Sequence, residues 1–222
     1  MGAGIEIRNI NRIFGSGRNA VQVLYDISAD VPASSLTILR GRSGSGKTTL
    51  LNIVGALDEP TSGEILVDGQ SLSGMSERAR ENLRRKRFGF VFQSVSLIPS
   101  MTAYQNVEFA LRMAGIKGDH KARTEQVLQM VGLGSRMKHM PAELSGGEQQ
   151  RVAIARAIVH HPEVVLADEP TAELDSAMAA EVTRLLKDLT RSEDVTVIMT
   201  THDVGLMDAG DKVIELAGGR VV

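Results

Sequence analysis

Residues 41–48 read Gly-Arg-Ser-Gly-Ser-Gly-Lys-Thr, and this stretch decides how the rest of the chain is interpreted. The largely apolar run before it, at 36–40, is typical of a buried strand, and the run after it, at 49–54, is typical of a helix. A glycine-rich turn between a strand and a helix is the context in which the pattern G-x-x-x-x-G-K-[ST] binds phosphate. The sequence therefore predicts a nucleotide-binding loop rather than a chance glycine-rich turn.

The chemistry of this loop follows from its residue types. Glycines allow successive backbone N–H groups to converge on an anion, and the N-terminus of the following helix adds a partial positive charge. The Lys47 ammonium is expected to reach the outer phosphates, and the Thr48 hydroxyl is expected to ligate Mg²⁺. The predicted nucleotide contacts in this region are Gly41, Ser43, Gly44, Ser45, Gly46, Lys47, Thr48 and Thr49.

Two acidic residues follow another apolar strand. Residues 164–167 read Val-Val-Leu-Ala without polar alternation, which is typical of a strand buried on both faces of a parallel sheet. Asp168 and Glu169 come directly after it. Two solvated acids at a strand end are common by themselves. Beside a phosphate loop, Asp168 is expected to hold the hydrated Mg²⁺, and Glu169 is expected to orient the water that attacks the γ-phosphate.

A histidine and a glutamine stand in comparable positions. His202 follows the strand predicted at 195–200, and Gln93 follows the strand predicted at 88–92. Because ligands bind at the carboxyl edge of parallel sheets, we expect His202 to contact the γ-phosphate and Gln93 to reach the metal or the attacking water. A polar strand terminus without a function is the competing interpretation for Gln93. The predicted catalytic residues are Lys47, Gln93, Glu169 and His202, and the predicted metal ligands are Thr48, Gln93 and Asp168.

The order of the predicted elements indicates an α/β fold with two attached parts. Strands and helices alternate late in the chain, which is typical of a parallel core. Early strands follow one another with little helix between them, so we expect a small antiparallel sheet laid against that core. Residues 97–156 are nearly all helical and predict an inserted helical subdomain, with the core and β subdomain at 1–96 and 157–222. Strands are expected at about 4–10, 20–31, 35–40, 63–67, 88–92, 163–167, 195–200 and 211–216, and helices at about 46–56, 76–86, 103–114, 120–131, 147–160 and 176–190.

Composition limits the classes of function. The chain has 222 residues, 42% of them hydrophobic, with a formal net charge of -2 and no cysteine. Domains that bind nucleic acid usually carry a basic excess, so no nucleic-acid partner is expected. No apolar run approaches the roughly 18 residues of a membrane helix, and the N-terminus does not resemble a secretion signal. The chain is expected to be cytoplasmic and to associate with a membrane only through a partner.

A motif in the helical region identifies the family that the chain resembles. Residues 144–150 read Leu-Ser-Gly-Gly-Glu-Gln-Gln, which is similar to the signature motif of ABC-transporter ATP-binding subunits. The phosphate loop, Gln93, this signature, Asp168, Glu169 and His202 occur in the order found in that family. The resemblance covers essentially the whole chain. It implies a RecA-like P-loop NTPase core that binds ATP with Mg²⁺ and hydrolyses it.

The resemblance also implies that each ATP site is formed by two chains. Each chain then contributes its phosphate loop to one site and its signature to the other. Ser145, Gly146 and Gly147 open a helix, and a serine followed by glycines at a helix N-terminus is an anion site in its own right. In the family, two domains pair head to tail, and the signature of one closes over ATP on the other. A homodimer is expected because this chain has one complete set of motifs, and a heterodimer is the alternative.

Two further positions match the family, and one departs from it. Phe14 stands where the family has an aromatic residue that stacks on adenine, and Asp175 matches the aspartate of the loop that follows Glu169. Glu173 departs from the pattern, because the family often has a small or amide-bearing residue there. This departure bears on the contact between the two domains.

Three stretches resemble one branch of the family. Residues 23–28, 55–63 and 166–171 are similar to bacterial ATPases of macrolide export, lipoprotein release and cell division. In that branch the ATPase drives a separate membrane permease, and we expect the permease to contact residues 93–107. The alternatives are an ABC ATPase that acts outside transport, and a module that uses ATP only as a dimer switch. Glu169 argues against the switch, since it supplies the means of hydrolysis.

Overall fold

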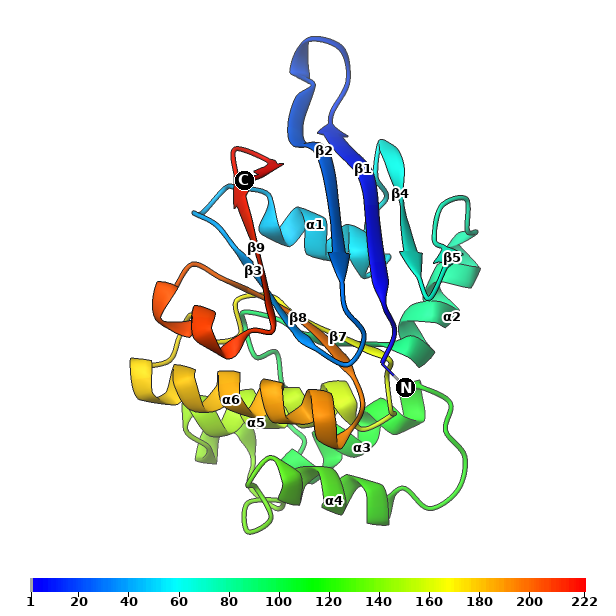
Figure 1. Cartoon of the computed structure of the whole chain (residues 1–222). Coiled ribbons are helices and arrows are strands. Elements are labelled where there is room, and N and C mark those ends of the chain that lie inside the picture. Colours follow the sequence, from blue (N-terminus) through cyan, green and yellow to red (C-terminus); the bar gives the residue numbers. More distant parts are fainter. Residues whose placement is uncertain (1) are drawn as a thin grey trace.

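A six-stranded sheet runs through the middle of the computed structural model, which describes residues 2–222 (Figure 1). Its strand order is β10-β9-β3-β8-β7-β6, and every neighbouring pair is parallel except β9 with β10. The mainly parallel core that the sequence predicts is therefore confirmed. The strands are β3 (Leu36–Arg40), β6 (Phe88–Val91), β7 (Val164–Ala167), β8 (Thr196–Thr201), β9 (Lys212–Ala217) and β10 (Arg220–Val221).

Side chains of the central strands alternate between the two faces of this sheet, because successive residues of a strand point to opposite sides. In β7, Val164 and Leu166 belong to one apolar cluster, whereas Val165 and Ala167 belong to the other. All four residues are buried. A strand that is covered on both faces needs no polar alternation, which explains the unbroken apolar run in the sequence.

The face that carries Val164 and Leu166 is covered by α1 (Lys47–Val54) and by a second, antiparallel sheet (Figure 1). The strand order of this second sheet is β2-β1-β4-β5. It is the small antiparallel sheet expected from the early strands. Its members are β1 (Ile5–Phe14), β2 (Val21–Val31), β4 (Ser62–Val67) and β5 (Gln70–Ser71).

The antiparallel sheet differs from the sequence prediction in its first strand. That strand was expected to end near residue 10, and it continues to Phe14. Irregular register between Ile7 and Ile13 keeps it paired with β2, and Asn9 adopts a φ of 48° within this region. Bulges of this kind interrupt the period of two without ending the strand. Strands β5 and β10 were not predicted, because two residues are too few to show a periodic pattern.

Helices cover the opposite face of the central sheet. In Figure 1, α5 and α6 lie directly beneath the sheet, and α3 and α4 lie beyond them. Within residues 2–222, no helix is both long and apolar enough to cross a membrane. The remaining helices are α2 (Glu77–Arg87), α3 (Ala103–Met113), α4 (Lys121–Met130), α5 (Gly146–Ile158) and α6 (Ser176–Ser192), with short 3-10 helices η1 (Gly17–Asn19), η2 (Pro141–Glu143) and η3 (Val204–Ala209).

Helix α5 joins the two parts that the sequence divides at residue 156. It contacts α3 and α4, and it also packs on α6 and on β6. The Ala157 carbonyl lies so close to Gly89 that a side chain at Gly89 would overlap it. One apolar cluster runs from α3 through α5 to the sheet. The boundary at 156 therefore falls inside a continuous helix, and the helical subdomain at 97–156 stays a prediction.

Candidate active site

Four parallel strands end at the same edge of the central sheet. Arg40 of β3 pairs with Thr201 of β8, Ala167 of β7 pairs with Met199 of β8, and Val91 of β6 pairs with Ala167. The segments that follow these four strands contain all of the predicted catalytic and metal-ligating residues. The strand register thus places them on one side of the molecule before any side-chain contact is considered.

The phosphate loop connects β3 to α1, and two of its glycines are required by their surroundings. A Cβ on Gly46 would stand 2.6 Å from Leu24 Cδ2, and the φ of Gly46 is 101°. A Cβ on Gly41 would overlap the Leu216 carbonyl and the Ser45 hydroxyl. Both positions therefore exclude a side chain. The backbone can pass tightly between β2 and β9 and turn directly into the first residue of α1.

Lys47 is held inside this loop. Its side chain is 4% exposed, and its Nζ donates hydrogen bonds to the Gly41 carbonyl at 2.8 Å and the Arg42 carbonyl at 3.3 Å. The same Nζ lies 3.3 Å from Glu169 Oε1, and this is an ion pair between two predicted catalytic residues. A buried ammonium with a carboxylate partner is far less costly than one without. The lysine that the sequence assigns to phosphates is thus fixed in position.

The Ser45 hydroxyl is the one buried side-chain polar group of the loop that lacks a partner within residues 2–222. Its Oγ is buried and forms no hydrogen bond there. A buried hydroxyl without a partner costs roughly 1–3 kcal/mol. Such a group next to the N-terminus of α1 suits an anion, which would accept the free O–H as well as the N–H groups of the first helical turn.

Asp168 is fixed by two threonine hydroxyls. Thr48 Oγ1 donates to Asp168 Oδ1 at 3.1 Å, and Thr200 Oγ1 donates to the same oxygen at 2.7 Å. Thr48 and Asp168 were both predicted as metal ligands, and the fold brings them into direct contact across 120 residues of sequence. Hard oxygen donors of this kind are the ligands that Mg²⁺ prefers.

Thr200 was not among the predicted site residues. It accepts a hydrogen bond from the Glu169 N–H at 2.8 Å while it donates to Asp168. One buried hydroxyl therefore positions both acids. In the sequence Thr200 is an ordinary β-branched residue of a predicted strand. The only signal that it carries is its place two residues before His202, at the end of a strand next to β7.

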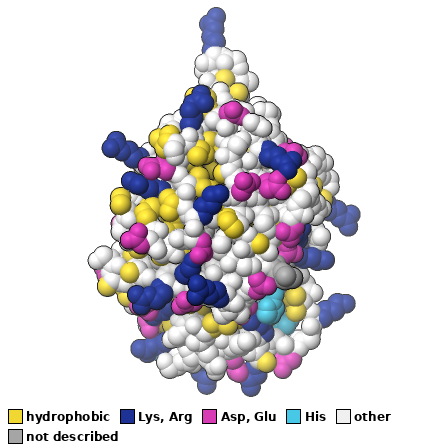
Figure 2. Space-filling model, in the orientation of Figure 1, with side chains coloured by type: hydrophobic (Ala, Val, Ile, Leu, Met, Phe, Trp, Pro, Cys, Tyr) yellow, Lys and Arg dark blue, Asp and Glu magenta, His cyan; other side chains and the backbone are white. Residues whose placement is uncertain are grey.

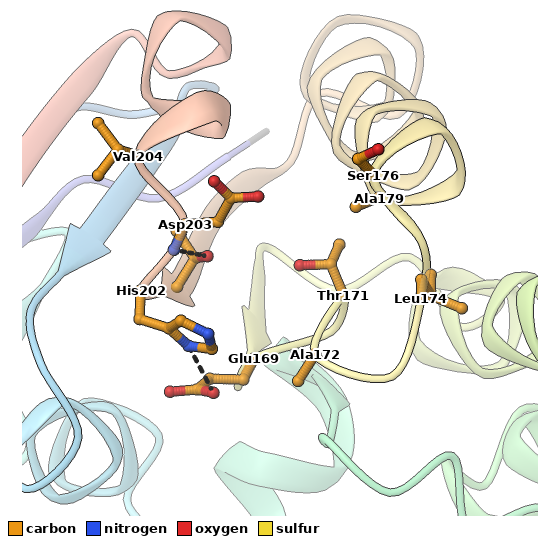
Figure 3. A pocket seen from close by; sticks show the side chains of 10 residues that line it. Glu169, Thr171, Ala172, Leu174, Ser176, Ala179, His202, Asp203 and Val204 are labelled. Atoms are coloured by element: carbon orange, nitrogen blue, oxygen red, sulfur yellow. Dashed lines mark hydrogen bonds and ion pairs between the residues drawn. The ribbon is translucent and has the colours of Figure 1, made fainter.

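The Glu169 carboxylate lies between two other predicted catalytic residues. Its Oε1 faces Lys47, and its Oε2 lies 3.2 Å from His202 Nδ1. The backbone of Glu169 has a φ of 43°, which is uncommon outside glycine and often marks a functional site. Figure 3 shows Glu169 and His202 meeting at the wall of a cleft of about 480 Å³. The cleft runs between the loop after β7 and the 3-10 helix η3.

Gln93 and Phe14 stand apart from this cluster. Gln93 is exposed two residues beyond the end of β6, and no hydrogen bond within residues 2–222 joins its side chain to Thr48 or Asp168. Phe14 ends β1 with 41% of its surface exposed. One face of its ring is covered by the Arg12 guanidinium, which lies 4.3 Å from the ring centroid. Arg12 is itself held by an ion pair with Asp58, so the ring is steadied from one side.

The signature residues form the N-terminus of α5. Ser145 is the N-cap residue, with its hydroxyl accepting from the Glu148 N–H at 3.3 Å. The Ser145 N–H donates to Glu148 Oε2, and this hydrogen bond, followed by that from the Ser145 hydroxyl, lowers the pKa of the Glu148 carboxyl. Gly147 lies against Met178, whose Cε would have to move to admit a side chain there. No hydrogen bond joins Ser145, Gly146 or Gly147 to the phosphate loop of the same chain within residues 2–222.

Asp175 has a structural role that the sequence did not predict. It is the N-cap residue of α6, and its Oδ1 accepts from the Met178 N–H at 2.9 Å. An aspartate at this position accepts a hydrogen bond from one otherwise free N–H. Its negative charge also interacts favourably with the partial positive charge at the helix N-terminus. Through Met178, the start of α6 is tied to the start of α5 at Gly147. The two loops that precede these helices therefore form one surface.

Comparisons with known proteins agree on one family. The family model described as ABC transporter matches residues 24–172, and a model for an AAA domain matches residues 138–208. The chain is 44% identical over 219 residues to the macrolide export ATP-binding/permease protein MacB of Marinobacter nauticus, which covers 98% of this chain and 34% of that protein. It therefore spans about a third of the length of the macrolide-export relatives that it matches.

Two other similar proteins resemble this chain over nearly all of their length. An uncharacterised ABC transporter ATP-binding protein of Thermotoga maritima is 40% identical over 98% of this chain and 93% of its own length. The dimeric structure of MJ0796, a bacterial ABC transporter cassette, superposes with a TM-score of 0.87 and 36% identity over 98% of this chain and 96% of that one. A structure of the same cassette in a post-hydrolysis state holds ADP and Pi, with the same TM-score and identity.

The position of Thr200 between two acids predicts a measurable loss of stability. Thr200→Val keeps the shape of the side chain, removes a hydrogen bond to Asp168 and leaves the Glu169 N–H without its acceptor. The free energy of unfolding should fall by about 1–3 kcal/mol, as measured by urea titration. Thr37→Val is the matched control, because Thr37 is fully buried in β3 and its hydroxyl has no partner within residues 2–222. Equal losses in the two variants would contradict the role given to Thr200.

Proposed function

This chain belongs to the ABC transporter family of ATP-hydrolysing proteins, and we propose that two copies close head to tail around two ATP molecules and drive a separate membrane permease. The observation that carries this proposal is the meeting of Lys47, Thr48, Asp168, Glu169 and His202 at one edge of the sheet. These side chains come from three separate stretches of the chain.

The phosphate loop fits the triphosphate of ATP. Lys47 presents its ammonium from within the loop, and the buried Ser45 hydroxyl supplies a further donor. The first N–H groups of α1 have no acceptor inside the helix, and α1 begins at Lys47, so these donors lie next to the same loop. The proposed contacts of the phosphates are therefore these donors together with the backbone of residues 43–46.

Thr48 and Asp168 fit a magnesium ion. Their oxygens lie 3.1 Å apart, and the Thr200 hydroxyl keeps the Asp168 carboxylate oriented. Mg²⁺ is usually held by one or two protein oxygens together with phosphates and water, which is the number of ligands that the chain offers here. When bound, the ion would neutralise part of the charge of the phosphates. Gln93 is a further ligand only if its loop moves toward Asp168.

Glu169 and His202 are the proposed hydrolytic pair. The Glu169 carboxylate accepts a proton from, or orients, the water that attacks the terminal phosphate. His202 contacts this carboxylate through Nδ1, and its Nε2, on the other side of the ring, is the atom proposed to contact a phosphate oxygen. The Thr200 hydroxyl accepts a hydrogen bond from the Glu169 N–H, so the residue is held at its backbone as well as at its carboxylate.

The exposed signature residues at the N-terminus of α5 support the proposal of a dimer. Ser145 and Gly146 lie exposed at the N-terminus of α5, where a helix favours an anion. They make no hydrogen bond to the phosphate loop of their own chain within residues 2–222. A two-fold pair places this N-terminus over the phosphate loop of the second copy. The dimeric form of the similar cassette MJ0796 supports this arrangement.

The permease partner rests on the relatives and on one cleft of the structure. The macrolide-export relatives combine ATP-binding and permease parts in one protein, and this chain matches a third of their length. A cleft of about 210 Å³ lies between α2, α3 and α5, and its lining includes Phe90, Met113 and Arg156. Arg156 donates a hydrogen bond to the Ser96 carbonyl at 2.8 Å, so this cleft borders the segment 93–107, which runs from the loop after β6 into α3. We place the permease contact there, on the cytoplasmic face of a membrane, with action of the macrolide-export or lipoprotein-release type.

The visible surface does not favour a nucleic-acid partner. Figure 2 shows Lys, Arg, Asp and Glu side chains interspersed over the face seen in Figure 1, without a region of one charge. Binding to a phosphate backbone draws on clustered positive charge.

The role of Glu169 predicts that hydrolysis and dimer formation separate in one variant. Glu169→Gln should release phosphate from Mg-ATP at least about a hundredfold more slowly, because a general base contributes about 10²–10⁴-fold. The same variant should bind Mg-ATP and elute as a dimer, since ATP between the copies is no longer consumed. Phosphate release and light scattering after gel filtration measure the two effects. Glu81→Gln on α2 is the control, and a Glu169→Gln variant that turns over normally would refute the assignment.

The exposed ring of Phe14 predicts a loss of nucleotide affinity that is independent of the phosphates. Stacking of a base on an aromatic side chain is worth about 1–3 kcal/mol, so Phe14→Ala should weaken ADP binding about tenfold or more. Phe14→Tyr keeps the ring and should bind as the parent does. Calorimetric titration with ADP measures both variants. Unchanged affinity in Phe14→Ala would show that adenine binds elsewhere.

A further inference from the structure

Glu173 and Arg42 are oppositely charged residues that the site described above does not use. Glu173 lies in the loop between β7 and α6, and Arg42 is the second residue of the phosphate loop. Both are exposed, and neither side chain forms an ion pair or hydrogen bond within residues 2–222. By contrast, Asp168 and Glu169 at the same edge are both engaged.

The loop that carries Glu173 shares a surface with the signature turn. Leu174 Cδ2 lies 3.9 Å from the position of a Cβ on Gly146, and Met178 at the start of α6 covers Gly147. Asp175 anchors the same segment by capping α6. Figure 3 shows the other side of this loop, where Ala172 and Leu174 line the cleft that contains Glu169. Glu173 therefore stands beside the signature and not in the core.

The partner of Glu173 follows from the geometry of the proposed pair, on which this inference rests. When the signature turn of one copy covers residues 41–48 of the other, the neighbouring loop at 172–175 reaches the rim of that same phosphate loop. A carboxylate arriving beside phosphates is repelled unless a cation accompanies it. Arg42 is the exposed cation of the loop, and a two-fold interface repeats each contact, so two such pairs form in one dimer.

We propose that Glu173 of one copy forms an ion pair with Arg42 of a second copy, and that this pair helps the chain to select an identical partner. A domain with a neutral residue at either position leaves one charge without its partner at the interface. Such a mismatch disfavours mixed dimers, and specificity of association commonly depends on unfavourable contacts of this kind.

Mixing two charge-reversed variants tests this pair directly. The variants are Glu173→Lys and Arg42→Glu, each in the Glu169→Gln background with Mg-ATP, and dimerisation is measured by analytical ultracentrifugation. Each variant alone opposes like charges, so its dimer dissociation constant should rise about tenfold or more. The two variants mixed together restore both ion pairs in a heterodimer. That heterodimer should form within about threefold of the parent affinity, which also shows that both chains are folded.

Two further measurements separate the possible explanations. Glu81→Lys makes the same charge change on α2, at an exposed residue with no ion pair within residues 2–222, and should dimerise as the parent does. The neutral variants Glu173→Gln and Arg42→Gln should show coupled effects, with the second change adding little once the first is made. A mixture no tighter than either reversed variant alone overturns the proposal. A parent that never dimerises overturns the proposed function and this inference with it.

Discussion

The structure depends on the register of the parallel strands β3, β8 and β7. A shift of one residue between any two of them would turn their side chains to the opposite face, and both apolar clusters would be lost. The burial that fixes this register also aligns the ends of the strands, so Gly41, Asp168 and His202 leave the sheet at the same edge. The packing of the sheet thus brings the charged and polar side chains of the site together. Hydrogen bonds and ion pairs between neighbouring side chains then fix their orientation. The Thr200 hydroxyl is one example, because it donates a hydrogen bond to Asp168 and accepts one from the Glu169 N–H.

The same fold separates two helix N-termini that we propose to serve one ligand. Lys47 and the two acids that follow β7 lie beside the N-terminus of α1, whereas the N-terminus of α5 is capped by Ser145 and Glu148. Helix α5 packs against β6, α3 and α6. In the proposed dimer a second copy brings the two helix ends together. ATP binding and association would then be a single event, and closure of the pair is the motion that we propose to drive the permease.

Much of the fold was readable in the sequence because its signals are local or periodic. The glycine pattern at 41–48, the apolar run before Asp168 and the serine with two glycines at Ser145 each specify a turn or strand without knowledge of distant residues. The family and the α/β class inferred from them are confirmed by the comparisons and the sheet. What the sequence could not reveal depends on pairing between distant segments. Thr200 reads as an ordinary strand residue until β8 lies beside β7. The cap at Asp175 is a local contact with the Met178 N–H, and it was missed because Asp175 was interpreted only through the family motif.

The central claim is that one complete ATP site needs two chains, and mixing two inactive variants tests it most directly. Lys47→Ala removes the phosphate-binding lysine, and Ser145→Arg blocks the signature surface, so neither variant should release phosphate from Mg-ATP by itself. Their heterodimer contains one intact site, formed by the loop of the Ser145→Arg chain and the signature of the Lys47→Ala chain. An equal mixture should therefore recover up to about a quarter of the parent rate, since about half of the dimers are mixed and each has one working site. A mixture that releases no more phosphate than the two variants measured separately would contradict the account.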